Sequence, residues 1–175
     1  MSRAANSRAL RRHRLTLTQV FASAVFAIEA QPIVIEVHID KGIGYYLVGL
    51  PDNAVKESNY RIAAALQISG YKLPGKRITI NLAPADLRKE GSAYDLPIAI
   101  GILSASGQIQ PTRLDSCCMM GELTLDGHLR PIKGVLPIAI QTKESGFSSL
   151  IVPKENAKEA AVVSGLSVYG FDHIK

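Results

Sequence analysis

The stretch from Ile78 to Leu103 reads ITINLAPADLRKEGSAYDLPIAIGIL, and the rest of the chain is interpreted around it. It begins with a short alternating run of β-branched residues, continues with a charged loop from Pro84 to Gly91, and ends with an apolar segment from Leu96 to Leu103 at helical spacing. These patterns predict a strand, a polar loop and a buried helix. Such a loop lies where unpaired helix N–H groups and exposed side chains can meet a ligand.

The overall composition predicts one folded domain preceded by a basic arm. The chain has 175 residues, of which 47% are hydrophobic, so it can build a sizeable core. Its formal net charge of +5 arises at the amino terminus, and the remaining 15 basic residues equal the 15 acidic residues. We therefore expect a flexible basic arm at residues 1–17 and a neutral single domain at residues 18–175. The arm contains the arginines Arg3, Arg8, Arg11, Arg12 and Arg14.

The cysteine, histidine and apolar patterns argue against a disulfide, a metal site and a membrane anchor. Cys117 and Cys118 are neighbours, and adjacent residues rarely reach disulfide geometry, so we expect reduced thiols in a cytoplasmic protein. These thiols and the four scattered histidines do not form a metal-ligand pattern. No apolar run approaches the roughly 18 residues of a membrane span. We predict neither metal ligands nor membrane contact.

The pattern along the chain favours an α+β fold. Pro32 to Ile39 alternates as a half-buried strand, and Tyr45 to Gly49 resembles the returning strand of a hairpin. Asp52 or Asn53 can cap the next helix, whose charged residues, including Arg61, we expect in solvent. A second hairpin is predicted near the Asp126–Gly127 turn, followed by helices and strands in alternation. Hairpins followed by αβ units predict an α+β sandwich with helices packed on a mixed sheet.

One loop nearly matches a nucleotide-binding motif. Gly70 to Arg77 reads GYKLPGKR, which is close to the phosphate-binding pattern G-x-x-x-x-G-K-[ST]. Arg77 stands where the motif needs a hydroxyl, and the loop is predicted to lead from a helix into a strand rather than the reverse. We therefore interpret it as a basic turn and predict no nucleotide-binding residues in this chain.

The central loop also raises the question of serine chemistry. A serine nucleophile needs a base within hydrogen-bond reach, and Ser92 could use Lys89 or Lys133. Lys89 is predicted to lie in a wet, charged loop that would leave its pKa unchanged. Ser92 or Asp95 can equally cap the helix that follows. Capping is the favoured interpretation, so no catalytic residue is assigned.

Several long sequence motifs in the chain resemble those of a known family. VGLPDNAVKES at residues 48–58 and NLAPADLRKEGSAYDLPIA at residues 81–99 are similar to the amino-terminal domain of magnesium-chelatase-subunit-like proteins of the competence ComM type. The resemblance extends from about Val20 to the end of the chain. It implies a domain similar to the proteolytic domain of Lon, with the fold called ribosomal protein S5 domain 2-like, a two-layer sandwich.

The resemblance also bears on peptidase chemistry. Lon-type peptidases carry a serine in a K-D-G-P-S-A-G word and a lysine a few residues after P-I-G-G. Alignment of Lys89-Glu90-Gly91 places Ala93 at the nucleophile, and alignment of Pro131-Ile132-Lys133-Gly134 places Leu136 at the lysine. Ser92 is one residue early, an offset that redirects a side chain. The resemblance therefore implies a Lon-like domain without peptidase activity.

Full-length members of this family join the domain to an AAA+ ATPase module, and the ComM type is associated with ATP-driven branch migration on DNA during natural transformation. The resemblance thus implies a non-catalytic binding and assembly domain that self-associates in a ring. ATP and Mg²⁺ are expected only in the ATPase module, which this chain lacks. A Ser-Lys peptidase rebuilt around Ser92 and a stand-alone partner-binding module are the alternatives. DNA-phosphate contact is expected of the basic loop residues Lys72, Lys76, Arg77, Arg88 and Lys89.

Overall fold

The computed structural model describes residues 17–175, so the predicted arm and its arginines lie outside the described residues apart from Leu17. Nine strands and several helices follow one another along the described chain. They are β1 (Leu17–Phe26), β2 (Glu29–Asp40), β3 (Gly44–Val48), α2 (Asn53–Lys56), α3 (Ser58–Ile68), β4 (Arg77–Ala83), α4 (Asp95–Ala105), η1 (Leu114–Ser116), β5 (Cys117–Met119), β6 (Glu122–Leu123), β7 (Leu129–Arg130), α5 (Val135–Glu144), β8 (Ser149–Pro153), η2 (Lys154–Asn156), α6 (Ala157–Ala160) and β9 (Ser167–Phe171).

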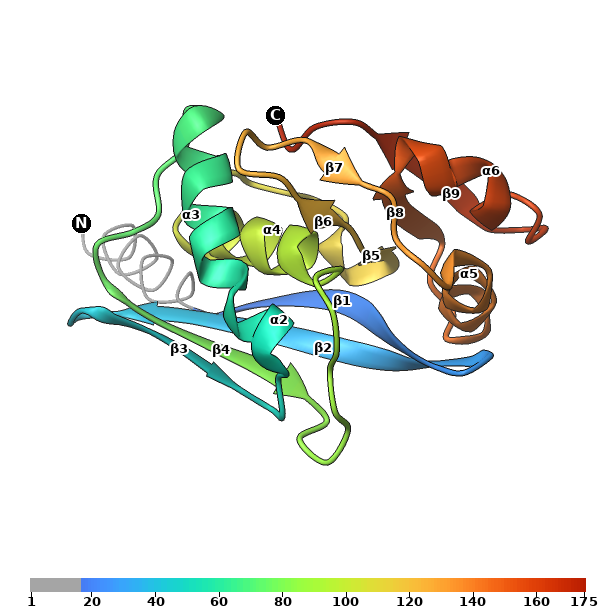
Figure 1. Ribbon diagram of the computed structural model, residues 1–175, viewed down its shortest axis with the longest axis horizontal. Helices are drawn as coiled ribbons and strands as arrows, with labels where there is room; N and C mark the ends of the chain where they lie inside the picture. The colour runs from blue at the N-terminus through green and yellow to red at the C-terminus, as the bar shows by residue number, and fades with distance from the viewer. Residues whose placement is uncertain (1–16) are drawn as a thin grey trace, which may run out of the picture.

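A seven-stranded mixed sheet forms the centre of the molecule (Figure 1). Its strand order is β3-β4-β2-β1-β5-β8-β9. β1, β2 and β4 pair antiparallel, whereas β5, β8 and β9 run parallel to β1 and to one another. The predicted α+β class with a mixed sheet is therefore confirmed. The hairpin after β5 is also confirmed, because β6 and β7 pair antiparallel as a separate small sheet.

The predicted hairpin between β2 and β3 is wrong. The chain does turn after Asp40, but β4 lies between these two strands, antiparallel to β2 and parallel to β3. β3, α3 and β4 thus form a parallel strand-helix-strand unit, whose long connection the helix supplies. Local alternation marked both segments as strands but carried no information about which neighbour each would pair with. The predicted last helix is also shorter than expected, with only η2 and the single turn α6 after Pro153.

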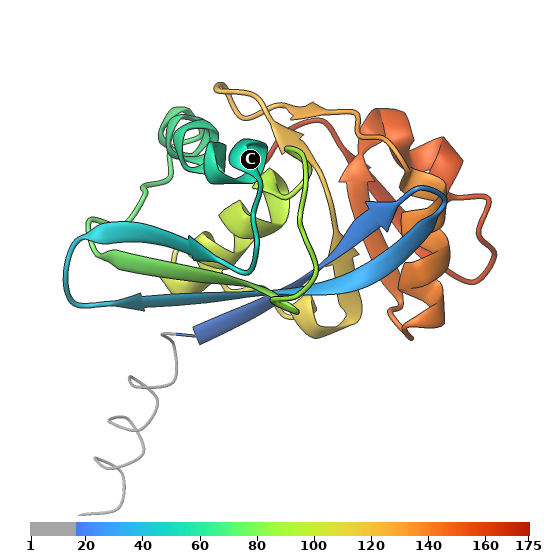
Figure 2. The same ribbon diagram turned by 60° about the horizontal axis from the view of Figure 1, so that its bottom comes forward.

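α4 and α5 pack on opposite faces of the sheet, as the turned view in Figure 2 allows the reader to follow, and both contact β1 and β2. α4 packs on the face that carries Val20 and Val37, and a Cβ built on Gly101 would lie 2.7 Å from Val37 Cγ2, which explains the glycine. α5 packs on the other face, where Gly134 at its start lies against Val25. The predicted two-layer arrangement is therefore incomplete, because helices lie on both faces of the sheet, with α4 on one face of β1 and β2 and α5 on the other.

The core lies mainly between α3, α4 and the strands β1, β2 and β4. Ile35, Ile80, Ile98 and Ile102 are fully buried there. Burial of one such side chain contributes about 1.5–3 kcal/mol, so this layer fixes the end of β4 and the start of α4. The loop between them, residues 84–94, is therefore presented from a rigid base.

Candidate functional site

Lys89 anchors the central loop from the inside. Its side chain is 0% exposed, and the ammonium donates hydrogen bonds to the carbonyl oxygens of Gly49, at 2.9 Å, and Pro84. Its backbone N–H donates to Leu50 O at 3.1 Å, and its carbonyl accepts from Asp52 N–H at 2.9 Å. Burial lowers the pKa of Lys89, and Asp86 opposes that shift. The expectation of a wet loop lysine was wrong, because the apolar stem follows the loop into the protein.

Asp52 fastens the same loop from the helical side. One carboxylate oxygen accepts from Val55 N–H at 2.8 Å and caps α2, as predicted. The other oxygen accepts from Gly91 N–H at 3.0 Å, so one side chain joins the first turn of a helix to the end of the central loop. The loop is thus held by backbone and side-chain bonds at both ends.

Asp95 and Arg61 form a buried ion pair beneath the loop. Arg61 Nε and Nη2 donate to the two carboxylate oxygens of Asp95 at 2.7 and 3.0 Å. Asp95 is 0% exposed and also accepts from Leu123 N–H at 3.1 Å. Burial raises the pKa of Asp95 to about 6, outweighing the guanidinium and the backbone donor. The expectation that Asp95 caps the helix and that Arg61 stays in solvent was wrong.

The Ser92 hydroxyl hydrogen-bonds to a carboxylate rather than to an amine. Its hydroxyl donates to Glu122 Oε2, a residue of β6. The Lys89 ammonium bonds to backbone carbonyls instead, and Lys133 is exposed at the turn before α5. The described structure therefore does not assemble Ser92 with either lysine. Ser92 does not cap α4 through its side chain either, because that helix begins after Tyr94 without a side-chain cap bond.

The two positions aligned with the Lon dyad carry no reactive group. Ala93 offers only its carbonyl, which accepts from Gly121 N–H at 2.8 Å. Leu136 is 37% exposed on the first turn of α5, where its N–H donates to Glu159 Oε1 at 3.1 Å. Neither position therefore supplies a nucleophile or a base.

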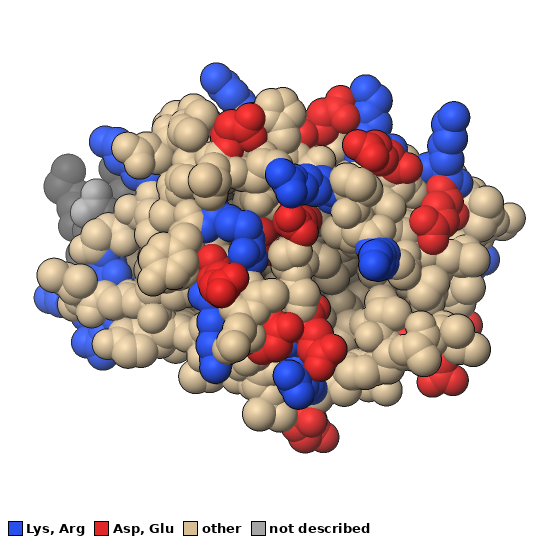
Figure 3. Space-filling model, viewed as in Figure 1, with Lys and Arg blue, Asp and Glu red and all other residues tan. Residues whose placement is uncertain are grey.

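The five basic residues predicted to meet DNA do not form one surface. Lys72, Lys76 and Arg77 lie at or before the start of β4, whereas Arg88 follows its far end, about 20 Å away at the usual rise per residue. Arg88 pairs with Glu90 at 3.0 Å on the surface, and buried Lys89 presents no charge to solvent. Basic and acidic side chains alternate over the face shown in Figure 3. The prediction that Lys89 presents its charge to DNA is therefore wrong.

The remaining basic end is a defined surface. Gln108 holds the backbone of Lys72 through two hydrogen bonds of 2.9 and 2.8 Å. Lys72, Lys76 and Gln108 line a hollow of about 360 Å³. Neither lysine has an ion pair within residues 17–175, whereas Arg77 lies 3.4 Å from Asp40 Oδ1. We call Lys72, Lys76 and Arg77 the basic end.

Residues 17–175 also bear on metal sites, reactive cysteines and membrane-spanning helices. No three histidine, cysteine or acidic side chains gather within residues 17–175 in a way that could hold a metal ion. Cys117 and Cys118 are buried free thiols. Over the same residues, every helix is too short or too polar to cross a lipid bilayer.

Sequence reasoning missed Arg61, Glu122 and Leu123 as partners of the central loop. An aspartate at the start of an entirely apolar helix was the available signal, because a buried carboxylate requires a partner. The position of that partner on α3 depended on tertiary packing.

Comparison with known proteins adds the family. Residues 35–156 match the family described as subunit ChlI of Mg-chelatase. The chain is 46% identical over 156 residues to competence protein ComM of Haemophilus influenzae, covering 89% of this chain and 30% of that protein. It is 44% identical over 162 residues to YifB of Escherichia coli, covering 92% and 32%. The chain thus spans about a third of the length of these relatives.

A more distant similarity links the chain to peptidases. Lon protease 2 of Bacillus subtilis is 33% identical over 101 residues, which cover 58% of this chain and 18% of that protein. Three observations agree with one another: the long ComM-like sequence motifs, the family match over most of the described domain, and the mixed α+β sheet. The chain therefore belongs to the ComM-type, magnesium-chelatase-like family.

Proposed function

We propose that this chain is a non-catalytic, Lon-like binding and assembly domain of a ComM-type AAA+ protein that processes DNA. Its fold is of the ribosomal protein S5 domain 2-like type, and residues 18–175 act as one unit. The similarity to competence protein ComM supports the link with DNA uptake, and that to Lon protease 2 supports the fold. ATP and Mg²⁺ belong in this proposal to an ATPase module outside the chain, with self-association as its assembly role.

One observation carries the non-catalytic part of the proposal. The hydroxyl of Ser92 donates to Glu122, and Ala93 and Leu136 stand where a Lon dyad would have its serine and lysine. A peptidase of this type requires an amine within hydrogen-bond reach of the hydroxyl. Incubation of the protein with a fluorescent casein should therefore release no fluorescence. Cleavage that disappears in Ser92→Ala would overturn this part.

The basic end is the proposed contact for DNA phosphates. Its two lysines have no ion pair among the described residues and flank one hollow, so their charges are available to an anionic backbone. Arg88 is the matched control, because it is also exposed but pairs with Glu90 beyond the opposite end of β4.

A salt series tests this contact. Fluorescence anisotropy with labelled duplex and single-stranded DNA should show weaker binding for Lys72→Ala/Lys76→Ala than for the parent protein. Loss of two phosphate contacts should reduce the slope of log affinity against log salt by about two. Arg88→Ala should change both quantities less. Equal binding by the double variant and the parent would retire the basic end as a DNA contact.

A further inference from the structure

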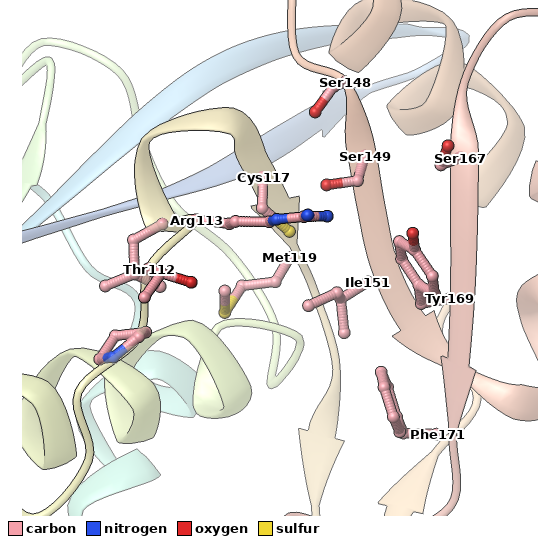
Figure 4. Close-up of a pocket in the computed structure, with 12 residues that line it drawn as sticks. Thr112, Arg113, Cys117, Met119, Ser148, Ser149, Ile151, Ser167, Tyr169 and Phe171 are labelled. Atoms are coloured by element: carbon pink, nitrogen blue, oxygen red, sulfur yellow. The ribbon is translucent and has the colours of Figure 1, made fainter.

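A second surface lies on the part of the sheet that α4 does not cover. α5 and α6 contact β8 and β9 from the opposite face, and no described helix lies across the α4-side face of β5, β8 and β9. That face carries the odd-numbered residues of these strands, including Met119, Ile151 and Phe171 (Figure 4). Tyr169 and Phe171 are 47% and 49% exposed there. We call the hollow on this face the sheet groove.

The lining of the sheet groove is divided by chemistry. Arg113 extends over the hollow from the segment before β5, and the hydroxyls of Ser149 and Tyr169 lie toward the same half in Figure 4. Met119, Ile151 and Phe171 form the other, apolar half. The hollow measures about 630 Å³, and no acidic residue among residues 17–175 lines it. Among these residues its only charged group is the Arg113 guanidinium, which lies beside an apolar floor.

The cation of the groove is not neutralised by any residue that the structure describes. Arg113 has no ion pair within residues 17–175, and only its backbone carbonyl is engaged, by the N–H and hydroxyl of Ser116. The Tyr169 hydroxyl likewise has no hydrogen bond to a described residue. A fork of guanidinium donors beside a free hydroxyl is suited to a carboxylate.

The groove extends beyond this first hollow. A second hollow of about 290 Å³ continues from it toward α4 and shares Met119, Ile151 and Phe171 with the first. Leu96, Ile100 and Leu129 line this extension. The groove therefore runs across the face of the sheet from Arg113 to a mostly apolar end, which His173 and Lys175 also line.

The strand bordering the groove has an open edge. β9 is the last strand of the sheet and pairs only with β8 among the described strands, so its other edge carries backbone groups without a strand partner. An extended chain can bind such an edge through its own backbone while placing alternate side chains in neighbouring hollows. Edge, apolar floor and cation thus lie together on one surface.

We propose that the sheet groove binds an extended peptide segment of a partner protein, in which a glutamate or aspartate stands next to apolar residues. The carboxylate pairs with Arg113 and the apolar side chains pack against Met119, Ile151 and Phe171. Nucleic acid fits less well, because a phosphate backbone needs a row of cations, whereas among the described residues the groove offers Arg113 and, in its extension, Lys175. This inference is independent of the proposed DNA contact, since the two surfaces share no residue.

A peptide array tests the inference. Short immobilised peptides carry one glutamate, glutamine or lysine between leucine and phenylalanine residues, and the purified labelled chain is applied to all three sets. Glutamate peptides should bind best and lysine peptides worst. Arg113→Ala should weaken glutamate binding about tenfold or more and remove its advantage over glutamine, because one charge-assisted bond is lost.

Two further variants keep the test decisive. Phe171→Ala should weaken all apolar peptides alike, whereas Arg88→Ala, which removes an equally exposed arginine outside the groove, should change nothing. Melting curves should show each variant folded, since these side chains are exposed. Absence of a glutamate preference, or a preference that survives Arg113→Ala, would overturn the proposal. Displacement of bound peptide by a labelled oligonucleotide that itself requires Arg113 would assign the groove to nucleic acid instead.

Discussion

The central loop and the basic end carry the same residue types in two opposite environments. Around the loop, Lys89, Asp95 and Arg61 are buried or half-buried and each bonds to a fixed protein group. At the basic end, Lys72 and Lys76 are exposed and have no ion pair among the described residues. Charges of the first kind hold the fold together, because removal leaves a buried group without a partner. Charges of the second kind remain available to a partner molecule.

Arg88 and Lys89 show that even neighbouring residues can differ in whether their charge is buried or exposed. They are neighbours in the chain, yet Arg88 pairs with Glu90 on the surface and Lys89 enters the protein. A surface ion pair of this type contributes about 0–1 kcal/mol, whereas a buried ammonium must be fully hydrogen-bonded. Charge content alone therefore does not identify a binding surface in this molecule.

The largest expected effect comes from breaking the buried pair. Asp95→Ala should lower the free energy of unfolding by about 3–5 kcal/mol, because the largely buried Arg61 guanidinium loses its charged partner. Urea unfolding followed by circular dichroism measures this change. Glu90→Ala is the control for a surface pair and should cost about 1 kcal/mol or less. Equal losses in the two variants would remove the distinction between the regions.

Lys89 should show an intermediate effect that depends on pH. Lys89→Met leaves the carbonyls of Gly49 and Pro84 without their donor, so a loss of about 1–3 kcal/mol is expected at neutral pH. The pKa of Lys89 is lowered from 10.5 in the folded protein, so the unfolded chain binds more protons between the two pKa values. The stability of the parent relative to Lys89→Met should therefore rise as pH increases toward 10.5.

Unfolding measured at several alkaline pH values tests this dependence. Lys76→Met is the matched control, because it makes the same substitution at a solvent-exposed position. A difference between Lys89→Met and the parent that stays constant with pH would show that burial does not perturb the Lys89 ammonium.

The smallest expected effect is at Ser92. Ser92→Ala removes one half-buried hydrogen bond to Glu122 and should cost about 1 kcal/mol. Ser167→Ala, which removes an exposed hydroxyl without a bonded partner among the described residues, should be near neutral. The shift in urea midpoint compares the two variants. If Ser92→Ala were as stable as the parent, the hydrogen bond from Ser92 to Glu122 would contribute no more to stability than an exposed hydroxyl does.

Much of the local structure was predictable. The alternation in β2, the apolar run of α4 and the Asp52 cap are confirmed because each depends on side chains close in sequence. The pairing of β3 with β4 was not predictable, because α3 connects the two strands and the pairing depends on its path. The roles of Lys89 and Asp95 were misassigned for the same reason, since their partners lie on other elements.

By itself, the sequence determined the α+β class and the family, because these depend on residue identity and short-range periodicity. Only the tertiary structure decided which charges are buried, where Ser92 directs its hydroxyl, and which sheet face remains uncovered. Burial is a property of packed elements rather than of residues. A lysine and an arginine side by side in the chain can therefore take opposite roles once the sheet and helices have closed around one of them.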